Sequence, residues 1–386
     1  MRFLDAGESH GRGISTIIEG CPAGLEIRRE DIEGELARRR RGYGRGKRMS
    51  MEGDRVEIQS GVRRGLSLGS PITLWVANQD HANWLGLMGT EATDQTGPVQ
   101  RVTTPRPGHA DLAGALKYGT RDIRDILERA SARETVGRVC AGCVARLLLR
   151  RLGIEIFSHV LAIGEVEADL AETPGLADVE RIEADELRCL DGTASLEMKR
   201  RIDEAARAGD TLGGIVEVIA DNVPAGLGSH AHWDRRLDGL LAQAVMSIQS
   251  VKGVEVGDGF ALASLPGSKA LDLIAYDEGR GYYRLADHAG GIEGGISNGE
   301  TIRVRAAIKP IPTLGRPAPT IDIETRTEVK ALAERSDVCA VPAAGVVAES
   351  MVAWVLANAL LEKTGGDHLA EVERRYRAHL KALKDF

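Results

Sequence analysis

The sequence predicts a mixed α+β fold in a single domain that spans residues 1–386. Strand-like and helical segments alternate irregularly, and the 46 glycines favour tight turns between neighbouring elements. The regular alternation of one strand with one helix that a doubly wound parallel sheet requires is not visible. A chain of 386 residues, 43% of them hydrophobic, can bury a substantial core.

Short apolar or alternating segments bounded by glycine or polar residues predict the strands. They lie at residues 14–20, 56–62, 70–78, 154–163, 213–223 and 300–308. Apolar residues at helical spacing predict the helices, as with Ile32 and Leu36 in the first of them. The helices lie at residues 29–39, 131–152, 198–209, 234–248, 344–366 and 368–384.

Two further local features bear on organisation. Ser131 is a candidate N-cap for the helix at 131–152, because Glu134 follows three residues later in a capping-box pattern. Residues 79–105 are predicted to form a long loop, and such a loop in a compact domain is usually functional or mobile.

Weak internal similarity suggests an ancient duplication. The segment ERASARETVGRV (128–139) leads into one long helix, and ERSDVCAVPAAGVVAES (334–350) leads into another. Likewise, GLSLGSPITLWV (65–76) resembles GGISNGETIRVRA (294–306) in the placement of its glycines and of the strand that follows. We therefore predict two similar halves, roughly residues 1–155 and 200–365.

Residues 38–48, RRRRGYGRGKR, concentrate positive charge in a chain whose formal net charge is -7. Cations held this close together repel one another, so an anionic ligand is expected among them. The acidic overall balance argues against a nucleic-acid binder that relies on net charge, although an RG-rich segment that binds RNA stays an alternative.

Cysteine usage and targeting signals indicate a cytoplasmic protein. The five cysteines are scattered, which argues against a disulfide framework. Cys140 and Cys143 form a C-x-x-C, but they lie among small residues in a helical pattern, so packing is the favoured interpretation and no metal cluster is predicted. No signal segment precedes the first strand, and no apolar run reaches the length of a membrane span.

Candidate chemistry lies in glycine-punctuated turns. GYGRGK (42–47) has the wrong spacing for a phosphate-binding P-loop, and no dinucleotide fingerprint follows a strand. His10 in GESHG and His109 in RPGHAD can exchange a proton near neutral pH. Arg129, Ser131 and Arg133 adjoin a predicted helix N-terminus, where either a phosphate or an ordinary cap fits.

Three later segments add to these candidates. In residues 309–313, KPIPT, two prolines fix the backbone, and Lys309 and Thr313 can hold an oxyanion. The segment GGIEGGISNG (290–299) is either a ligand-binding loop or a tight hairpin. In ERSDVC (334–339), Asp337 is a candidate acid or base beside Arg335. Together these features indicate an enzyme that handles polyanionic small molecules by proton transfer and electrostatics.

These motifs, taken in order, resemble the chorismate synthase family over nearly the whole chain. The matching stretches are AGESHG (6–11), RRGYGRGKRM (40–49), RPGHADL (106–112), ERASARET (128–135), SIQSVKGVEVGDGF (247–260), GGIEGGISNG (290–299), KPIPT (309–313) and RSDVC (335–339). The resemblance implies an anti 1,4-elimination of phosphate from 5-enolpyruvylshikimate 3-phosphate, giving chorismate in the last step of the shikimate pathway. It also implies a need for reduced FMN without net redox change, a homotetramer and a βαβ-sandwich core.

The resemblance also assigns roles to residues. His10 would assist the departing phosphate, His109 would stand beside the flavin N1, and Asp337 would manage the proton at the flavin N5. Substrate carboxylates and phosphate would be surrounded by Arg39, Arg45, Arg48, Arg106, Arg133 and Arg335. FMN would lie against Arg129, Ala130, Ser131, Gln249, Ser250, Gly294, Lys309, Pro310, Ile311, Pro312, Thr313 and Arg335.

Departures and absences refine the expectation. Ser336 stands where many members have histidine, which removes a titratable group beside Asp337. No reductase-like insertion is visible, so the resemblance implies that FMN is reduced by an external reductant and that NADPH acts only indirectly. The other cations of the 38–48 segment, among them Arg38, are expected at the surface, in subunit contacts or as long-range attraction for anions. A flavin oxidoreductase that consumes NAD(P)H remains an alternative.

Overall fold

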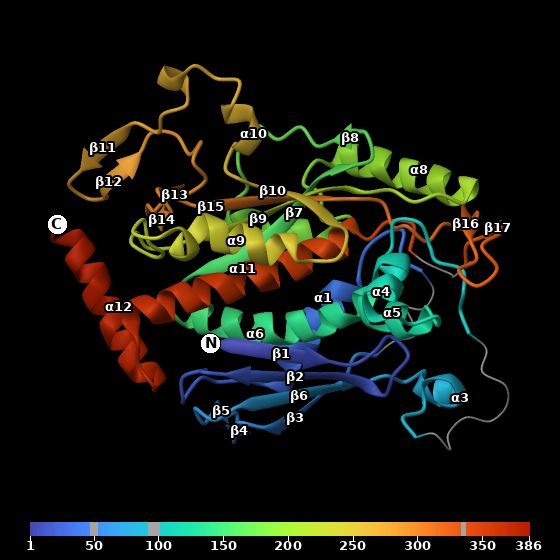
Figure 1. Ribbon diagram of the computed structural model, residues 1–386. Helices are drawn as coiled ribbons and strands as arrows, with labels where there is room; N and C mark the ends of the chain where they lie inside the picture. Colours follow the sequence, from blue (N-terminus) through green and yellow to red (C-terminus); the bar gives the residue numbers. More distant parts are fainter. Residues whose placement is uncertain (47–52, 92–100, 333–336) are drawn as a thin grey trace.

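Two antiparallel sheets enclose a central layer of helices, as the computed structural model shows for residues 1–46, 53–91, 101–332 and 337–386 (Figure 1). The first sheet has the order β1-β2-β6-β3, formed by Arg2–Ala6, Gly13–Glu19, Ile72–Ala77 and Val56–Ser60. The second has the order β10-β15-β9-β7-β8, formed by Val251–Val256, Ile302–Ile308, Gly214–Asp221, Glu155–Ile163 and Val166–Glu167. The predicted α+β sandwich is therefore confirmed.

Four helices form the central layer. They are α1 (Arg29–Arg40), α6 (Thr135–Arg151), α9 (Leu237–Met246) and α11 (Val341–Thr364). Because α6 and α11 contact each other and lie between the sheets, nearly all their residues are apolar or small and buried. α11 is long and apolar enough to cross a membrane by composition alone, but 78% of its most apolar window is buried inside the protein.

Small residues set the distance between the layers. A methyl group on Gly142 of α6 would lie 2.3 Å from the Cβ of Ser350 on α11. One on Gly137 of α6 would lie 2.7 Å from the Cβ of Asp5 in β1, and one on Gly345 of α11 would lie 2.8 Å from the hydroxyl of Ser158 in β7. The contacts of β1 with α6, of α6 with α11 and of α11 with β7 thus each include a glycine that lets the neighbours approach closely.

Smaller elements surround this core. The short strands pair as hairpins: β4 (Val62–Arg63) with β5 (Leu66–Ser67), β11 (Ile274–Asp277) with β12 (Gly281–Arg284), β13 (Ile292–Glu293) with β14 (Ile296–Ser297), and β16 (Pro319–Ile321) with β17 (Glu328–Lys330). The remaining α-helices are α3 (Leu85–Met88), α4 (Asp111–Tyr118), α5 (Arg124–Ala130), α7 (Val179–Ala184), α8 (Gly192–Ala208), α10 (Gly259–Leu262) and α12 (Leu369–Lys384). The single 3-10 turns are η1 (His81–Trp84), η3 (Ala132–Glu134), η4 (Leu176–Asp178), η5 (Trp233–Arg235) and η6 (Gly267–Lys269).

The predicted strands and helices are all found, with shifted boundaries in several cases. The helix predicted from residue 198 starts at Gly192, because the Asp191 carboxylate accepts hydrogen bonds from the next backbone amides and caps it. Ser131 does act as an N-cap, but of the turn η3, and α6 begins only at Thr135. The predicted loop at 79–105 contains η1 and α3 in its described part, while residues 92–100 lie outside the described residues.

The two sheets share a common strand arrangement. The order β1-β2-β6-β3 matches β7-β9-β15-β10 in the sequence of strands and in the position of the following helix, α6 or α11. The matched hairpins β4–β5 and β13–β14 also share a hydrogen-bond pattern. The hydroxyl of Ser67 accepts from the amide of Leu25 and donates to the carbonyl of Pro22, as Ser297 does with Leu227 and Pro224.

This correspondence supports the predicted duplication, which stays a prediction. The matching strands would place the start of the second half at β7, near residue 155, rather than near 200. The segment from 168 to 213, which carries α7 and α8, would then be an insertion between the first two strands of that half.

Candidate functional site

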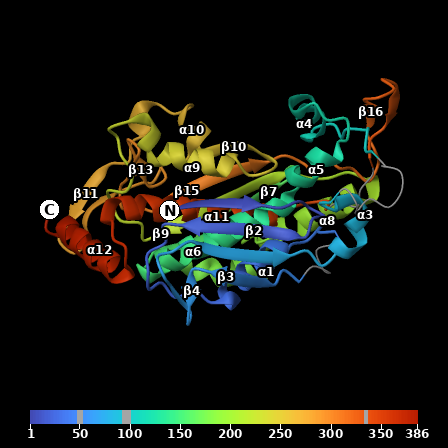
Figure 2. The same cartoon turned by 60° about the horizontal axis from the view of Figure 1, so that its bottom comes forward.

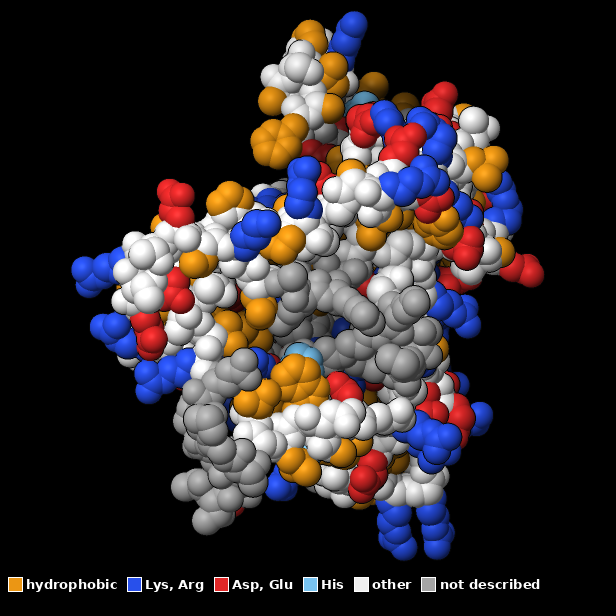
Figure 3. Space-filling view, turned by 90° about the vertical axis from the view of Figure 1, so that its right-hand side faces the viewer, with side chains coloured by type: hydrophobic (Ala, Val, Ile, Leu, Met, Phe, Trp, Pro, Cys, Tyr) orange, Lys and Arg blue, Asp and Glu red, His pale blue; other side chains and the backbone are white. Residues whose placement is uncertain are grey.

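The predicted site residues gather at one end of the sandwich. This end carries the β1–β2 turn, the segment after α1, α4, α5 and the β16–β17 hairpin, and both Figure 1 and Figure 2 place these elements together. α6 and α11 both begin here, since each directly follows a loop with predicted site residues. In Figure 3, which faces this end, a histidine lies beside hydrophobic side chains near the middle of the surface.

His10 is buried in the β1–β2 turn and is held on two sides. Its backbone amide donates to Glu128 Oε2 at 2.8 Å, and its ring Nδ1 lies 3.0 Å from each Glu128 oxygen. The ring stacks on Trp84, with centroids 3.8 Å apart. Burial would raise the pKa of Glu128, but hydrogen bonds and charge from His10, together with Arg124, lower it below its usual value.

His109 belongs to a compact cluster with Arg106 and Asp111. Its Nδ1 lies 2.5 Å from Asp111 Oδ1, and the Arg106 guanidinium donates to Asp111 Oδ2 at 2.8 Å. Burial opposes ionisation of Asp111, yet hydrogen bonds from His109 and Arg106 hold its pKa well below the usual range. The ionised carboxylate therefore orients both predicted site residues.

Arg39 and Arg133 converge on a buried carboxylate, Asp54. Arg133 Nη1 lies 3.0 Å from Asp54 Oδ1, and Arg39 Nη1 lies 3.9 Å from Asp54 Oδ2. Arg39 is also anchored by its Nε, which donates to the Thr135 hydroxyl at 2.7 Å. The two guanidinium groups thus come from α1 and η3, far apart in the sequence, and share one counter-ion.

Arg45 pairs with Asp337 across the two halves of the chain. Arg45 Nη1 lies 3.0 Å from Asp337 Oδ2, and the backbone amide of Gly46 donates to Asp337 Oδ1 at 2.6 Å. The backbone fixes this pairing, because the amide of Val338 donates to the carbonyl of Gly44 at 2.8 Å. A side chain on Gly44 would meet Ile202 and Cys339, so close approach of the segments requires glycine there.

The predicted cofactor residues Arg129 and Ser131 lie at the junction between α5 and η3. Arg129 donates to the Asp5 carboxylate at 2.8 Å and to the carbonyl of Gly7 at 3.1 Å. The Ser131 hydroxyl lies 3.2 Å from that of Ser9, next to His10. Ala130 is the last residue of α5.

A second group of predicted cofactor residues lies where β10 and β15 meet the site. Gln249 Nε2 donates to Glu134 at 2.7 Å, while its buried Oε1 has no hydrogen-bond partner among the described residues. Ser250 adopts a left-handed backbone conformation (φ 69°), and its carbonyl accepts from the amide of Lys309 at 2.9 Å. Lys309 Nζ donates to the carbonyl of Gly108 at 2.5 Å, which brings this group to His109.

The rest of the 309–313 segment lies in the same region, near Gly108 and His109. The carbonyl of Ile311 accepts from the hydroxyl of Thr211 at 2.7 Å, and a side chain on Gly108 would meet Pro312 at 3.4 Å. Pro310 precedes Ile311, and Thr313 is buried. Asp5 and Glu134 are two neighbouring acids: burial first, and then the charge of Glu134, raise the pKa of Asp5.

One predicted site residue lies elsewhere. Gly294 is in the turn of the β13–β14 hairpin, which packs against the start of α9 at the opposite end of the molecule (Figure 1 and Figure 2). The ambiguous segment 290–299 is thus a tight hairpin, and the role of Gly294 in binding FMN stays a prediction. Arg48, Arg335 and Ser336 lie outside the described residues.

Sequence reasoning missed the carboxylates that hold the site together. Glu128, Asp54 and Asp111 are each buried, and each contacts a predicted site residue. Asp111 was detectable, since it lies five residues after Arg106 in the same motif. Asp54 carries no local signal, because its partners come from other segments. Trp84 lies in the predicted loop at 79–105, where only a functional role in general was expected.

The expectation of a superficial Arg38 is wrong. Its guanidinium donates to both oxygens of Glu349, at 2.8 and 3.0 Å, inside the helical layer. Arg146 and Arg188 each donate to the same carboxylate at 2.7 Å, as does the Ser158 hydroxyl. Burial would raise the pKa of Glu349, but the charges of the arginines outweigh it and hold the pKa well below its usual range.

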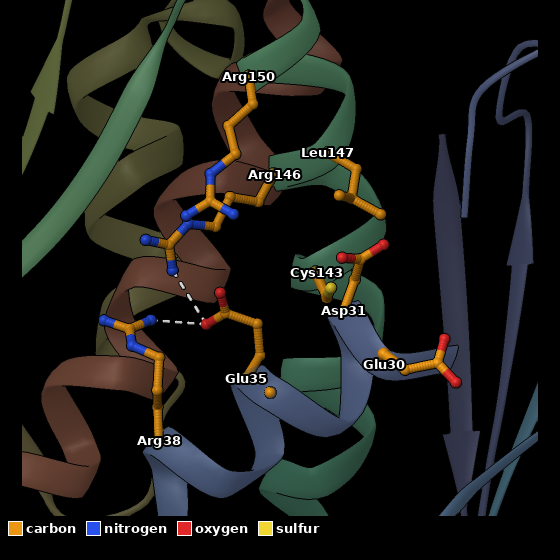
Figure 4. A pocket seen from close by; sticks show the side chains of 9 residues that line it. Glu30, Asp31, Glu35, Arg38, Cys143, Arg146, Leu147 and Arg150 are labelled. Atoms are coloured by element: carbon orange, nitrogen blue, oxygen red, sulfur yellow. Dashed lines mark hydrogen bonds and ion pairs between the residues drawn. The ribbon is translucent and has the colours of Figure 1, made fainter. Parts of the chain in front are cut away.

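A cavity of about 280 Å³ adjoins this buried network on the side of the molecule (Figure 4). It lies between α1 and α6, where Glu35 accepts from Arg38 at 2.6 Å and from Arg146 at 3.0 Å. Cys143 also lines it, and Cys140 is fully buried nearby in α6. Both cysteines are buried in the hydrophobic core, which confirms the interpretation of the C-x-x-C as helix packing. The cavity is separate from the end of the sandwich that carries His10.

Comparisons with known proteins agree over the whole chain. The model of the family described as chorismate synthase matches residues 1–361. A protein of Moorella thermoacetica named chorismate synthase is 55% identical over 385 residues, covering 100% of both chains. A protein of Bacillus cereus named chorismate synthase 2 is 52% identical, again over 100% of both. A crystal structure of chorismate synthase has a TM-score of 0.81 and 44% identity, covering 100% of this chain and 98% of its own.

Proposed function

Because the chain belongs to the chorismate synthase family, we propose that the cluster at the end of the sandwich is the site where its reaction takes place. As a member of this family, the protein is a carbon–oxygen lyase that eliminates phosphate from 5-enolpyruvylshikimate 3-phosphate to form chorismate, the last step of the shikimate pathway. The observation that carries the proposal is the meeting of His10, Arg39, Arg133 and the Arg45–Asp337 pair at one end of the fold.

The substrate offers anions that match this cluster. It carries two carboxylates and a phosphate, and guanidinium groups bind such anions through charge-assisted, often bidentate hydrogen bonds. The proposed ligands are Arg39, Arg45, Arg48, Arg106, Arg133 and Arg335. Carboxylates already fix several of these arginines, so their geometry is set before an anion arrives, which reduces the entropy lost on binding.

The residues around Gln249 fit a flavin. The unpartnered buried Oε1 of Gln249 offers an acceptor, and the Lys309 ammonium and Arg129 guanidinium offer cations for a phosphate. We place FMN against Arg129, Ala130, Ser131, Gln249, Ser250, Lys309, Pro310, Ile311, Pro312, Thr313 and Arg335. Reduced FMN would supply electron density to the allylic system of the substrate, with no net redox change.

The proposed proton-handling residues are His10, His109 and Asp337. His10 would donate a proton to the departing phosphate, as its buried position beside an ionised Glu128 permits. His109 would hold a proton at the flavin N1, and Asp337 would accept the proton at N5. Arg106 and Arg45 orient these two groups through the contacts described above.

The assembly is proposed to be a cytoplasmic homotetramer whose FMN is reduced by an external reductant, with NADPH acting only indirectly. Exposed apolar side chains on the β11–β12 hairpin support contact with further copies. There, Ile274 is 65% exposed and Tyr276 is 62% exposed.

The decisive experiment is an anaerobic assay with 5-enolpyruvylshikimate 3-phosphate and chemically reduced FMN, without nicotinamide. Equal amounts of chorismate and phosphate are expected. His10→Ala and His109→Ala should each lose at least about tenfold in rate while keeping the parent circular dichroism, since acid–base groups contribute about 10²–10⁴-fold. A folded protein that forms no chorismate refutes the proposed site and cofactor, and parent rates in either variant remove that residue's role.

The alternatives make different predictions. A flavin oxidoreductase would consume NAD(P)H in step with product, which the nicotinamide-free assay excludes if chorismate forms. RNA binding through residues 38–48 is disfavoured, because Arg38 is engaged with Glu349 and Glu35 inside the helical layer and the chain carries a formal net charge of -7.

A further inference from the structure

Glu128 holds His10 more completely than a simple ion pair requires. Its carboxylate is buried in α5, with 3% of the residue exposed, and it accepts from both the backbone amide and the ring Nδ1 of His10. Two attachment points on one residue fix both the position of its backbone and the rotation of its ring. Arg124, one turn earlier in α5, donates to Glu128 Oε1 at 3.2 Å and holds the carboxylate in turn.

Trp84 restrains the His10 ring from its face. Its indole stacks on the His10 ring with an interplanar angle of 29°, and its Nε1 is anchored by Asp80 at 2.8 Å. The Arg124 guanidinium lies over the same indole, 5.5 Å from its centroid. The imidazole is therefore clamped between a carboxylate at its edge and an aromatic ring on its face.

This arrangement has a consequence for the proton on His10. An ionised carboxylate beside Nδ1 can only accept, so Nδ1 carries a hydrogen, and Nε2 is the nitrogen turned away from Glu128. This orientation suits a group that exchanges a proton with a departing phosphate at Nε2.

We propose that Glu128 is a positioning residue that fixes the tautomer and the ring orientation of His10 for proton transfer at Nε2. The proposal rests on the function proposed above for His10. The other charged or titratable groups that face this pair in the described chain are Arg124, His81, which contacts the His10 carbonyl at 3.1 Å, and Asp80 through Trp84.

The test compares Glu128→Gln with a matched control, Asp125→Asn. Both variants remove one negative charge from α5, but Asp125 is exposed, and its carboxylate accepts a hydrogen bond from the Thr120 hydroxyl at 2.6 Å. Glu128→Gln should lower kcat at least about tenfold with KM within about threefold, as expected for loss of acid–base function. Asp125→Asn should match the parent in both kcat and KM.

A double-mutant cycle separates positioning from general damage. In a His10→Ala background, adding Glu128→Gln should change kcat by less than about twofold, because interacting sites are not additive. Glu128→Asp, which keeps the charge on a shorter side chain, should recover part of the loss and serves if Glu128→Gln does not fold. A kcat within about twofold of the parent in a folded Glu128→Gln variant, or additive losses in the cycle, overturns the proposal. Loss of all activity in the parent assay would instead refute the proposed function.

Discussion

Glu349 provides a sharp test of how the central layer is stabilised. It is fully buried and accepts hydrogen bonds from Arg38, Arg146, Arg188 and Ser158. In Glu349→Gln the side chain keeps its shape, but one oxygen becomes an NH₂ group. Whichever oxygen is replaced, at least two arginine donors then face another donor, as the bonds to each oxygen show.

The expected loss can be estimated in two ways. Removing one partner of a buried ion pair costs about 3–5 kcal/mol, because the remaining charge stays buried. Two lost hydrogen bonds to charged groups, at about 1.5–3 kcal/mol each, lead to a similar range. We therefore expect Glu349→Gln to lower the free energy of unfolding by about 3–5 kcal/mol.

Urea unfolding, followed by circular dichroism and tryptophan fluorescence, measures this loss without screening the charges. The matched control is Glu362→Gln on the same helix, whose partner Arg235 is as exposed as Glu362 itself, at 54%. An exposed pair contributes about 0–1 kcal/mol, so the control should stay near the parent. Equal losses in both variants, or a loss below about 1 kcal/mol in Glu349→Gln, would refute the reasoning.

The same residue predicts the direction of the pH dependence. Its pKa is lowered in the folded protein, so its contribution is present above the pKa of an unfolded glutamate, about 4.3, and is lost as the pH falls below it. The stability difference between the parent and Glu349→Gln should therefore shrink on acidification. A difference that stays constant down to pH 3 would contradict the direction of this shift.

Two further predictions concern thiols and the paired hairpins. The native protein should react slowly with a thiol reagent and rapidly only in urea, because burial raises the pKa of all five cysteines: Cys21, Cys140, Cys143, Cys189 and Cys339. Fast labelling of the folded protein would contradict this. Ser67→Ala and Ser297→Ala should each cost about 1–3 kcal/mol in urea unfolding, since each leaves an unpaired amide at matched positions. Clearly unequal losses would argue against equivalent hairpins.

The strands and helices of the fold could be predicted from the sequence more accurately than the residues at which they begin and end. Alternating and helical apolar patterns identified the sheets and the central helices, because burial on one or both faces controls those patterns. The start of α8 was missed, since its cap at Asp191 is a single polar residue without a distinctive context. The strand β1 was missed as well, because one half-buried strand of five residues offers little periodicity.

The candidate site residues were predicted from their motifs. The carboxylates that contact them were not. His10, His109 and Asp337 stand in motifs that carry glycine and charge, which sequence alone can detect. Asp54 and Glu128 are buried carboxylates whose role depends on which arginine or histidine meets them in space. The same limit explains the error for Arg38, because its charge suggested a surface position while its carboxylate partners come from other segments.

The glycines between the packed elements affect the geometry of the proposed site, although they lie far from it. α6 begins just after Arg133, and α11 begins just after Asp337, so each helix carries one wall of the site at its first turn. A methyl group added at Gly142 would have to displace a whole helix, because Ser350 occupies the space. The distance between the two site segments is therefore set in the middle of the molecule, where glycine in place of a larger residue lets the two helices pack closely.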